Sequence, residues 1–280
     1  MQKRPFSPAK VPLPVVGEGT WNMERDDRAQ AIAAIRRGLD LGVTHVDTAE
    51  LYGRGRVEAL VAEAIEGRRD EVYLVSKVVP SNASRKGAVD ACERSLRRLK
   101  TDRLDLDLLH WPGPHPLEET VAAFESLVRD GKIRAWGVSN FDVEDLDALL
   151  RCTTADRVAC NQVLYHLEER AIEHRVIPWC EARGVSVVAY SPFGSGSFPS
   201  PESSGGKVLA GIAAARGVTA HAVALAFLAR RPSVFVIPKA SDPRHVEANA
   251  AAGALTLDDD EIAAIDRAFP LGRSTDLPTL

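Results

Sequence analysis

Three side chains with different acid–base chemistry follow neighbouring strand-like segments of this chain. Asp47, Lys77 and His110 each stand where one such segment ends, and Tyr52 lies in the loop just after Asp47. A carboxylate, an ammonium, an imidazole and a phenol gathered at one place can polarise a carbonyl group and protonate its oxygen. The pattern therefore predicts acid–base chemistry on a carbonyl compound, provided that the fold brings the three strand ends together.

Each of these residues, taken singly, also has a purely structural explanation. Asp47 could cap a turn, Lys77 could be a surface lysine at a strand end, and His110 could be a hydrogen-bonded core histidine. The joint pattern favours chemistry, because consecutive parallel strands present their ends at the same rim.

Short β-rich runs alternate with amphipathic stretches along the whole chain. Apolar residues at helical spacing, such as Ile32, Ile35 and Leu39, mark the stretches between the runs. Eight such repeats within 280 residues favour a closed (β/α)₈ barrel, a TIM barrel of the α/β class, over an open sheet. The β-rich runs cover residues 14–17, 43–46, 72–75, 104–109, 133–138, 158–162, 185–190 and 234–237.

The two ends of the chain add smaller features to this barrel. We expect residues 10–13 to pair with the start of the chain as a short β-hairpin, and the polar tail at 270–280 to lie over the barrel rim. The segment 193–207 is rich in Ser, Gly and Pro, which suits a mobile rim loop and a solvated connector equally well. We therefore predict one domain over residues 1–280.

The bulk composition excludes several classes of partner. A net charge of −4 gives no electrostatic reason to expect nucleic acid or an anionic membrane surface. No apolar run reaches the roughly 20 residues of a membrane helix. The four cysteines form no CxxC pair, which is typical of reduced thiols in the cytoplasm. We expect a cytoplasmic monomer that acts on a small carbonyl compound. A metal-dependent hydrolase is disfavoured, because no cluster of histidines and carboxylates is spaced to hold an ion.

Sequence motifs in order along nearly the whole chain resemble the aldo-keto reductase family. They are GEGTW, DTAELYG, VSK, LLHWP, GKIRAWGVSNF, NQV, AYSPFG and VIPKA, followed by Asn249. Within the family the chain is most similar to short bacterial reductases of methylglyoxal and 2,5-diketogluconate. The resemblance implies reduction of aldehydes and ketones to alcohols with NADPH.

The resemblance also implies roles for the four residues singled out above. Tyr52 would be the general acid, His110 would orient the carbonyl oxygen, and Asp47 would hold Lys77 in place. A free phenol has a pKa of about 10, and we expect the Lys77 ammonium to lower that value by stabilising the phenolate. Substrate would contact Trp21, Tyr52, His110 and Trp111, with Leu51 at the mouth of the pocket and the tail or Phe193 closing it.

The cofactor would lie along the remaining strand ends. Ser139, Asn140 and Gln162 suit the nicotinamide carboxamide, and Tyr190 offers a face on which the ring can stack. The first two could also cap the helix that begins near Val143. The expected cofactor contacts are Gly19, Thr20, Trp21, Asp47, Ser139, Asn140, Gln162, Tyr190, Ser191, Pro192, Phe193, Ser195, Lys239, Ser241, Arg244, His245 and Asn249.

The adenosine end of the cofactor is expected near Lys239. The sequence Ser241–Asp242–Pro243 is typical of a helix start, and a helix N-terminus attracts phosphate. With Arg244 and His245 nearby, a 2′-phosphate would be well paired, which favours NADPH. The family often has Ser or Thr at position 240 and Arg at position 245, where this chain has Ala240 and His245, so use of NADH as well is possible. A cofactor-binding redox sensor or regulatory protein on the same fold is the alternative function.

Overall fold

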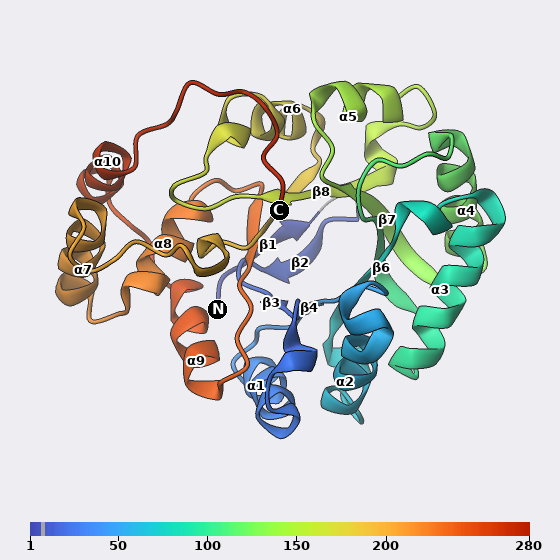
Figure 1. The fold of residues 1–280 in the computed structure, drawn as a ribbon, viewed down its shortest axis with the longest axis horizontal. Coiled ribbons are helices and arrows are strands. Elements are labelled where there is room, and N and C mark those ends of the chain that lie inside the picture. Colours follow the sequence, from blue (N-terminus) through green and yellow to red (C-terminus); the bar gives the residue numbers. More distant parts are fainter. Residues whose placement is uncertain (7–8) are drawn as a thin grey trace.

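The computed structural model describes residues 1–6 and 9–280. Across these residues, eight parallel strands form one sheet surrounded by helices (Figure 1). The strands of this sheet are β3 (Glu18–Gly19), β4 (His45–Asp47), β5 (Tyr73–Val78), β6 (Leu104–Leu109), β7 (Ile133–Ser139), β8 (Val158–Leu164), β9 (Ser186–Tyr190) and β10 (Val234–Ile237). The helices are α1 (Arg28–Asp40), α2 (Arg56–Ala64), α3 (Arg85–Leu99), α4 (Leu117–Arg129), α5 (Val143–Leu149), α6 (Val176–Arg183), α7 (Ser204–Arg216), α8 (Ala220–Leu228), α9 (Pro243–Ala252) and α10 (Asp259–Ala268).

The sheet closes into a barrel between its first and last strands. Val16 and Val236 form a parallel bridge, as do Gly19 and Lys239. The backbone N–H of Gly19 donates to the Pro238 carbonyl at 3.0 Å. A Cβ at Gly19 would lie 2.6 Å from the Ile237 carbonyl oxygen, so only glycine allows the two strands to approach this closely. The predicted (β/α)₈ barrel is confirmed.

Most of the predicted run at 14–17 belongs to the first barrel strand. Pro14 belongs to the N-terminal hairpin, but Val15 and Val16 pair with β10: Val16 bridges Val236, whose N–H donates to the Val15 carbonyl at 3.0 Å. Both valines are buried in the main hydrophobic core. Pairing with β4 begins only at Glu18, so the predicted run covers the part of the first strand that pairs with β10.

The predicted N-terminal hairpin is present and plugs one end of the barrel. β1 (Lys3–Phe6) pairs antiparallel with β2 (Val11–Pro14). The Phe6 ring lies edge-on to Phe235 and Tyr73, at centroid distances of 5.2 and 5.6 Å. Tyr73 opens β5, so the plug fills the end where the strands begin. The opposite rim, where the strands end, stays accessible.

Two helix starts differ from the sequence-based expectation. Asp142, not Ser139 or Asn140, caps α5, and it forms a capping box with Asp145. α7 begins at Ser204, so the last part of the segment 193–207 is helical rather than loop, with the Ser203 hydroxyl accepting from the Gly206 N–H at 3.0 Å.

The tail after α10 returns across the barrel mouth, where the C-terminus lies (Figure 1). It is fixed at its base, because an Arg170 guanidinium N–H donates to the Phe269 carbonyl at 2.7 Å. In the described part of the chain, no single helix is long and apolar enough to span a bilayer. α7 and α8 meet that test only as a pair bent by 99°.

Candidate active site

The centre of the candidate site is a buried lysine that contacts three oxygen atoms. The Lys77 ammonium donates to Asp47 Oδ1 at 2.5 Å, to the Thr48 carbonyl at 2.8 Å and to the Tyr52 hydroxyl at 3.2 Å. The side chains of Lys77 and Asp47 are 0% and 2% exposed. Gln162 donates from its amide nitrogen to the second Asp47 oxygen at 2.8 Å, so both carboxylate oxygens are bound. The strand ends of β4 and β5 thus meet as the sequence predicted.

The protonation states follow from these contacts. Burial alone would lower the pKa of the Lys77 ammonium, but the charge of Asp47 raises that pKa above its ordinary value, so the lysine stays charged. Burial raises the pKa of the Tyr52 phenol by more than Lys77 lowers it, and the charge of Asp47 adds to the rise. Lys77 lowers the Tyr52 pKa as expected, but burial and the charge of Asp47 together outweigh it, so the pKa lies above its ordinary value. Tyr52 keeps its proton at neutral pH.

His110 stands beside Tyr52 as a neutral imidazole. The two rings meet edge-to-face with a centroid distance of 5.8 Å. Burial, assisted by the charge of Lys77, lowers the pKa of His110 to about 3. Its buried Nδ1 has no hydrogen-bond partner among the described residues. A neutral imidazole carries one N–H, which makes His110 a hydrogen-bond donor without a positive charge.

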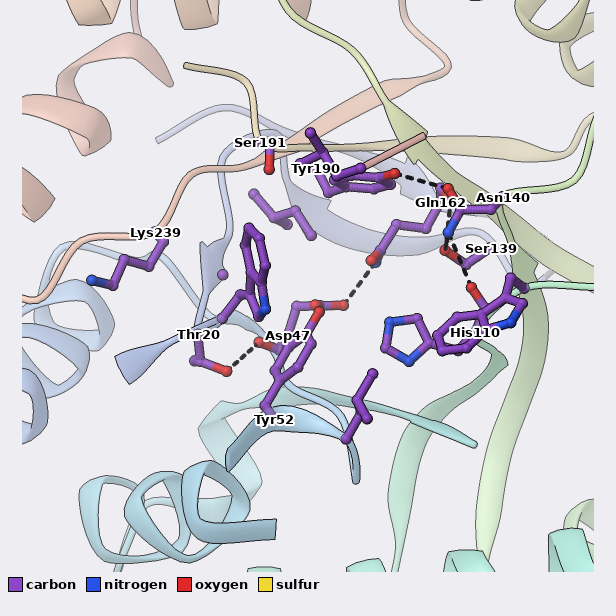
Figure 2. Close-up of a pocket in the computed structure, with 16 residues that line it drawn as sticks. Thr20, Asp47, Tyr52, His110, Ser139, Asn140, Gln162, Tyr190, Ser191 and Lys239 are labelled. Carbon is purple, nitrogen blue, oxygen red and sulfur yellow. Dashed lines mark hydrogen bonds between the residues drawn. The ribbon is translucent and has the colours of Figure 1, made fainter. Parts of the chain in front are cut away.

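A chain of hydrogen bonds forms the wall opposite Tyr52, as Figure 2 shows. The Tyr190 hydroxyl donates to Asn140 Oδ1 at 2.9 Å, and Asn140 Nδ2 donates to the His110 carbonyl at 3.1 Å. The Ser139 hydroxyl donates to the Gln162 carbonyl at 2.8 Å. Strands β6, β7, β8 and β9 are thereby linked at the rim, which fixes the positions of their polar side chains.

Two residues in the same wall of the site have left-handed backbone conformations. Asn140, directly after β7, has φ 58°, and Ser191, directly after β9, has φ 48°. Asparagine adopts this left-handed conformation at modest cost, whereas serine rarely does. Such strain persists where the surrounding structure holds it, and it clusters at functional sites.

These residues line a cavity of about 300 Å³ at the barrel mouth. Trp21, Leu51 and Trp111 form its outer edge, with exposed fractions of 44%, 48% and 39%. The expected substrate contacts therefore lie together, and Lys77 lies beneath them without reaching the surface. The cavity is lined by Gly19, Thr20, Trp21, Asp47, Leu51, Tyr52, His110, Trp111, Ser139, Asn140, Gln162, Tyr190, Ser191, Ile237, Lys239 and Leu280.

A second cavity of about 250 Å³ lies beyond Lys239. It is lined by Phe193, Thr219, His221, Lys239, His245, Ala248 and Asn249. Phe193 packs against Phe198 and His221 there, so it belongs to this cavity and does not close the substrate end as expected.

Four of the expected cofactor contacts line neither cavity. Pro192 lines a separate small pocket next to His166, and Ser195 lies in the turn η7 (Gly194–Gly196). Ser241 donates a hydrogen bond to Asp26. Arg244 lies exposed at the start of α9, where it forms an ion pair with Asp242 at 2.6 Å. In this structure Arg244 pairs with the N-cap carboxylate of its own helix, and its side chain is 84% exposed.

Sequence reasoning missed several residues that line the two cavities, Ala248 among them, and one residue beside Lys239. Ile237 and Thr219 line the walls, and His221 stacks on Phe198 with a centroid distance of 3.9 Å. Asp26 forms an ion pair with Lys239. For most of these residues no local sequence pattern indicates a place at a cavity. Ile237 is the exception, because it lies two residues before Lys239 in the sequence.

The sequence profile of the Aldo/keto reductase family matches residues 15–269. The chain belongs to the aldo/keto reductase family. Members of this family are NAD(P)H-dependent oxidoreductases, and the predicted family resemblance is confirmed. Among the described residues, no group of three or more His, Cys, Asp or Glu side chains is placed to hold a metal ion.

Two bacterial relatives place this reductase within the family. It is 46% identical over 262 residues to methylglyoxal reductase YeaE of Escherichia coli strain K12, covering 93% of this chain and 92% of the relative. It is 31% identical over 263 residues to methylglyoxal reductase DkgB of Salmonella typhi, covering 91% and 93%. Both likenesses extend over nearly the whole reductase.

Solved structures agree with this placement. An aldo/keto reductase from Klebsiella pneumoniae, crystallised with NADP and acetate, superposes with a TM-score of 0.93 at 44% identity and covers 100% of both chains. A second Klebsiella pneumoniae aldo-keto reductase structure, in complex with NADPH, gives the same TM-score and identity and covers 100% of this chain and 99% of the other.

Proposed function

We propose that this reductase uses NADPH to reduce small aldehydes and α-dicarbonyls such as methylglyoxal to alcohols, with Tyr52 as the general acid. The observation that carries the proposal is the position of Lys77, whose ammonium contacts both Asp47 and the Tyr52 hydroxyl beneath the active-site cavity. The names of the relatives, both methylglyoxal reductases, support this substrate class.

The four residues have complementary tasks in this proposal. Bound NADPH supplies a hydride to the carbonyl carbon. Tyr52 keeps its proton until negative charge develops on the carbonyl oxygen, and then donates it from Oη. The Lys77 ammonium, 3.2 Å from that hydroxyl, stabilises the phenolate that remains. His110 donates a hydrogen bond to the same carbonyl oxygen and fixes its direction.

The chemistry of the cavity wall fits a nicotinamide cofactor. Ser139, Asn140 and Gln162 offer hydroxyl and amide groups beside the Tyr190 ring, as a carboxamide and a stacked ring require. Lys239 lies on the opposite side of the cavity from His110 (Figure 2), on the way to the second cavity, so a long ligand can extend from one to the other. These donors and this path support NADPH or NADH as the cofactor.

The decisive test is the decay of NADPH absorbance with methylglyoxal, followed by the same assay with Tyr52→Phe. We expect kcat/KM to fall by about 10²–10⁴-fold, because only the proton donor is lost. The Kd of NADPH should stay nearly unchanged. Tyr73→Phe is the matched control, since it removes a phenol at the plugged end of the barrel.

The two ways of failing have different meanings. Turnover by Tyr52→Phe at the wild-type rate would overturn the role of Tyr52. Tight NADPH binding by the wild-type protein without reduction of any small aldehyde or dicarbonyl would overturn the enzymatic proposal.

A further inference from the structure

Lys239 stands at the junction of the two cavities. It is a lining residue of the active-site cavity and also of the second cavity, which contains His221, His245 and Asn249. Its side chain is 35% exposed, so a ligand that extends from one cavity to the other passes within reach of the ammonium. An anionic group on that ligand would be attracted to this position.

The Lys239 ammonium already has a counter-ion inside the protein. Asp26, in the turn before α1, accepts from it through Oδ2. The Ser241 hydroxyl donates to the same carboxylate oxygen at 2.5 Å. Burial alone would raise the pKa of Asp26, but the hydrogen bonds from Lys239 and Ser241 lower it below its ordinary value, so Asp26 is ionised.

The Asp26 carboxylate therefore occupies the place that an anionic ligand group would take. It receives one hydrogen bond from an ammonium and one from a hydroxyl, which are the donors that a phosphate oxygen accepts in proteins. Its side chain is 32% exposed, so it is not locked in the core. The other cation expected here, Arg244, is held by Asp242. Asp26 thus neutralises the cation through which a phosphate would bind.

We propose that Asp26 determines cofactor specificity by holding Lys239 in the position that the 2′-phosphate of NADPH must take over. This inference rests on the proposed function, and goes beyond it by assigning a role to a residue outside the catalytic group. NADPH must displace Asp26 from Lys239 and then tolerate a carboxylate beside its phosphate, whereas NADH leaves the pair intact. Asp26 therefore lowers the preference for NADPH over NADH.

The opposite role for Asp26 predicts the opposite result. If Asp26 served to orient Lys239 toward the phosphate, removing its charge would weaken NADPH binding. If the pyrophosphate rather than the 2′-phosphate met Lys239, removing the charge would tighten NADPH and NADH equally. The roles are therefore distinguished by whether removing the charge tightens or weakens NADPH binding, and by whether NADH binding changes as well.

The test measures Kd by titration calorimetry for NADPH, NADH and adenosine 2′,5′-bisphosphate. With Asp26→Asn we expect Kd for NADPH and for the bisphosphate to fall roughly fivefold, because these ligands no longer have to break a partly exposed ion pair. Kd for NADH should stay constant. The gain should shrink at high salt. In a Lys239→Ala background, Asp26→Asn should have little effect on NADPH.

The neighbouring Asp27 provides a matched control. It caps α1 by accepting from the Gln30 N–H at 2.8 Å, and asparagine caps equally well. Asp27→Asn removes the same charge one residue away and should leave all three constants unchanged.

The outcomes also separate this inference from the proposed function. Weaker NADPH binding by Asp26→Asn, or equal tightening of NADPH and NADH, overturns the role of Asp26 alone. Failure of the wild-type protein to bind either dinucleotide overturns the proposed function and this inference together.

Discussion

The buried pair of Lys77 and Asp47 gives a sharp prediction for stability. Lys77→Met removes the ammonium but keeps much of the side-chain volume, so Asp47 stays in the core without its counter-ion. Removing one partner of a buried ion pair typically costs about 3–5 kcal/mol of unfolding free energy. Asp47 keeps its hydrogen bond from Gln162 at 2.8 Å, which favours the lower end of that range.

The chain offers an exposed pair with the same geometry as a control. Lys86 and Asp90 also meet at 2.5 Å, but their side chains are 86% and 44% exposed. Lys86→Met should cost less than about 1 kcal/mol, because water already solvates both charges. The expected difference between the two variants is therefore due to burial and to the further hydrogen bonds of Lys77, and not to the distance between the paired charges.

Urea unfolding followed by tryptophan fluorescence measures both costs, with melting temperature as a second readout. A loss of about 3 kcal/mol corresponds to roughly 6–12 °C for a chain of this size. The double variant Asp47→Asn/Lys77→Met should recover most of the lost stability, because no unpaired charge remains in the core. Equal losses in Lys77→Met and Lys86→Met would refute the reasoning.

Two further predictions concern histidines and pH. Burial lowers the pKa of His45 to about 4 from 6.5, so the native state binds fewer protons than the unfolded state in that window. The free energy of unfolding should fall as pH drops from 6.5 toward 4, by at most about 1.4 kcal/mol per pH unit from this residue. Urea unfolding of His45→Phe should show a smaller acid loss, and an unchanged loss would contradict the prediction. His110, with its pKa lowered to about 3, should stay neutral in the assay range. His110 should therefore cause no inflection near pH 6.5 in the profile of kcat/KM. The profiles of the wild-type protein and of His110→Gln should have the same shape in that range.

The sequence predicted the barrel and the meeting of Asp47 and Lys77 at one rim because both depend on local order. Asp47 and Lys77 each stand at the end of a strand, and parallel strands place those ends at one rim whatever the details of packing. The hairpin followed in the same way from a short β-rich run next to the chain start. The predicted first strand at 14–17 includes Val16, which pairs with β10, but it stops before Glu18 and Gly19, which pair with β4.

The charges around the cofactor path depended on contacts that the sequence pattern does not encode. Asp26 and Lys239 are 213 residues apart, and only the closed ring brings them together. The ion pair of Arg244 with the N-cap Asp242 of its own helix was likewise not foreseen. The effect of Lys77 on the Tyr52 pKa was predicted, but the larger effect of burial was not, because a loop position does not reveal the degree of burial.

The place where the ring closes also determines when the site can exist. β3 leaves the ribosome well before β10, yet they form adjoining strands. Until β10 is made, the early strands have a free edge. Asp47 also lacks the hydrogen bond from Gln162 until that residue, 115 positions downstream, has been made. Unfinished chains therefore expose a sheet edge that is prone to aggregation. A ligand that contacts both Trp21 and Lys239 would stabilise the junction between β3 and β10. Its concentration in the cell would therefore influence what fraction of the finished chains is folded.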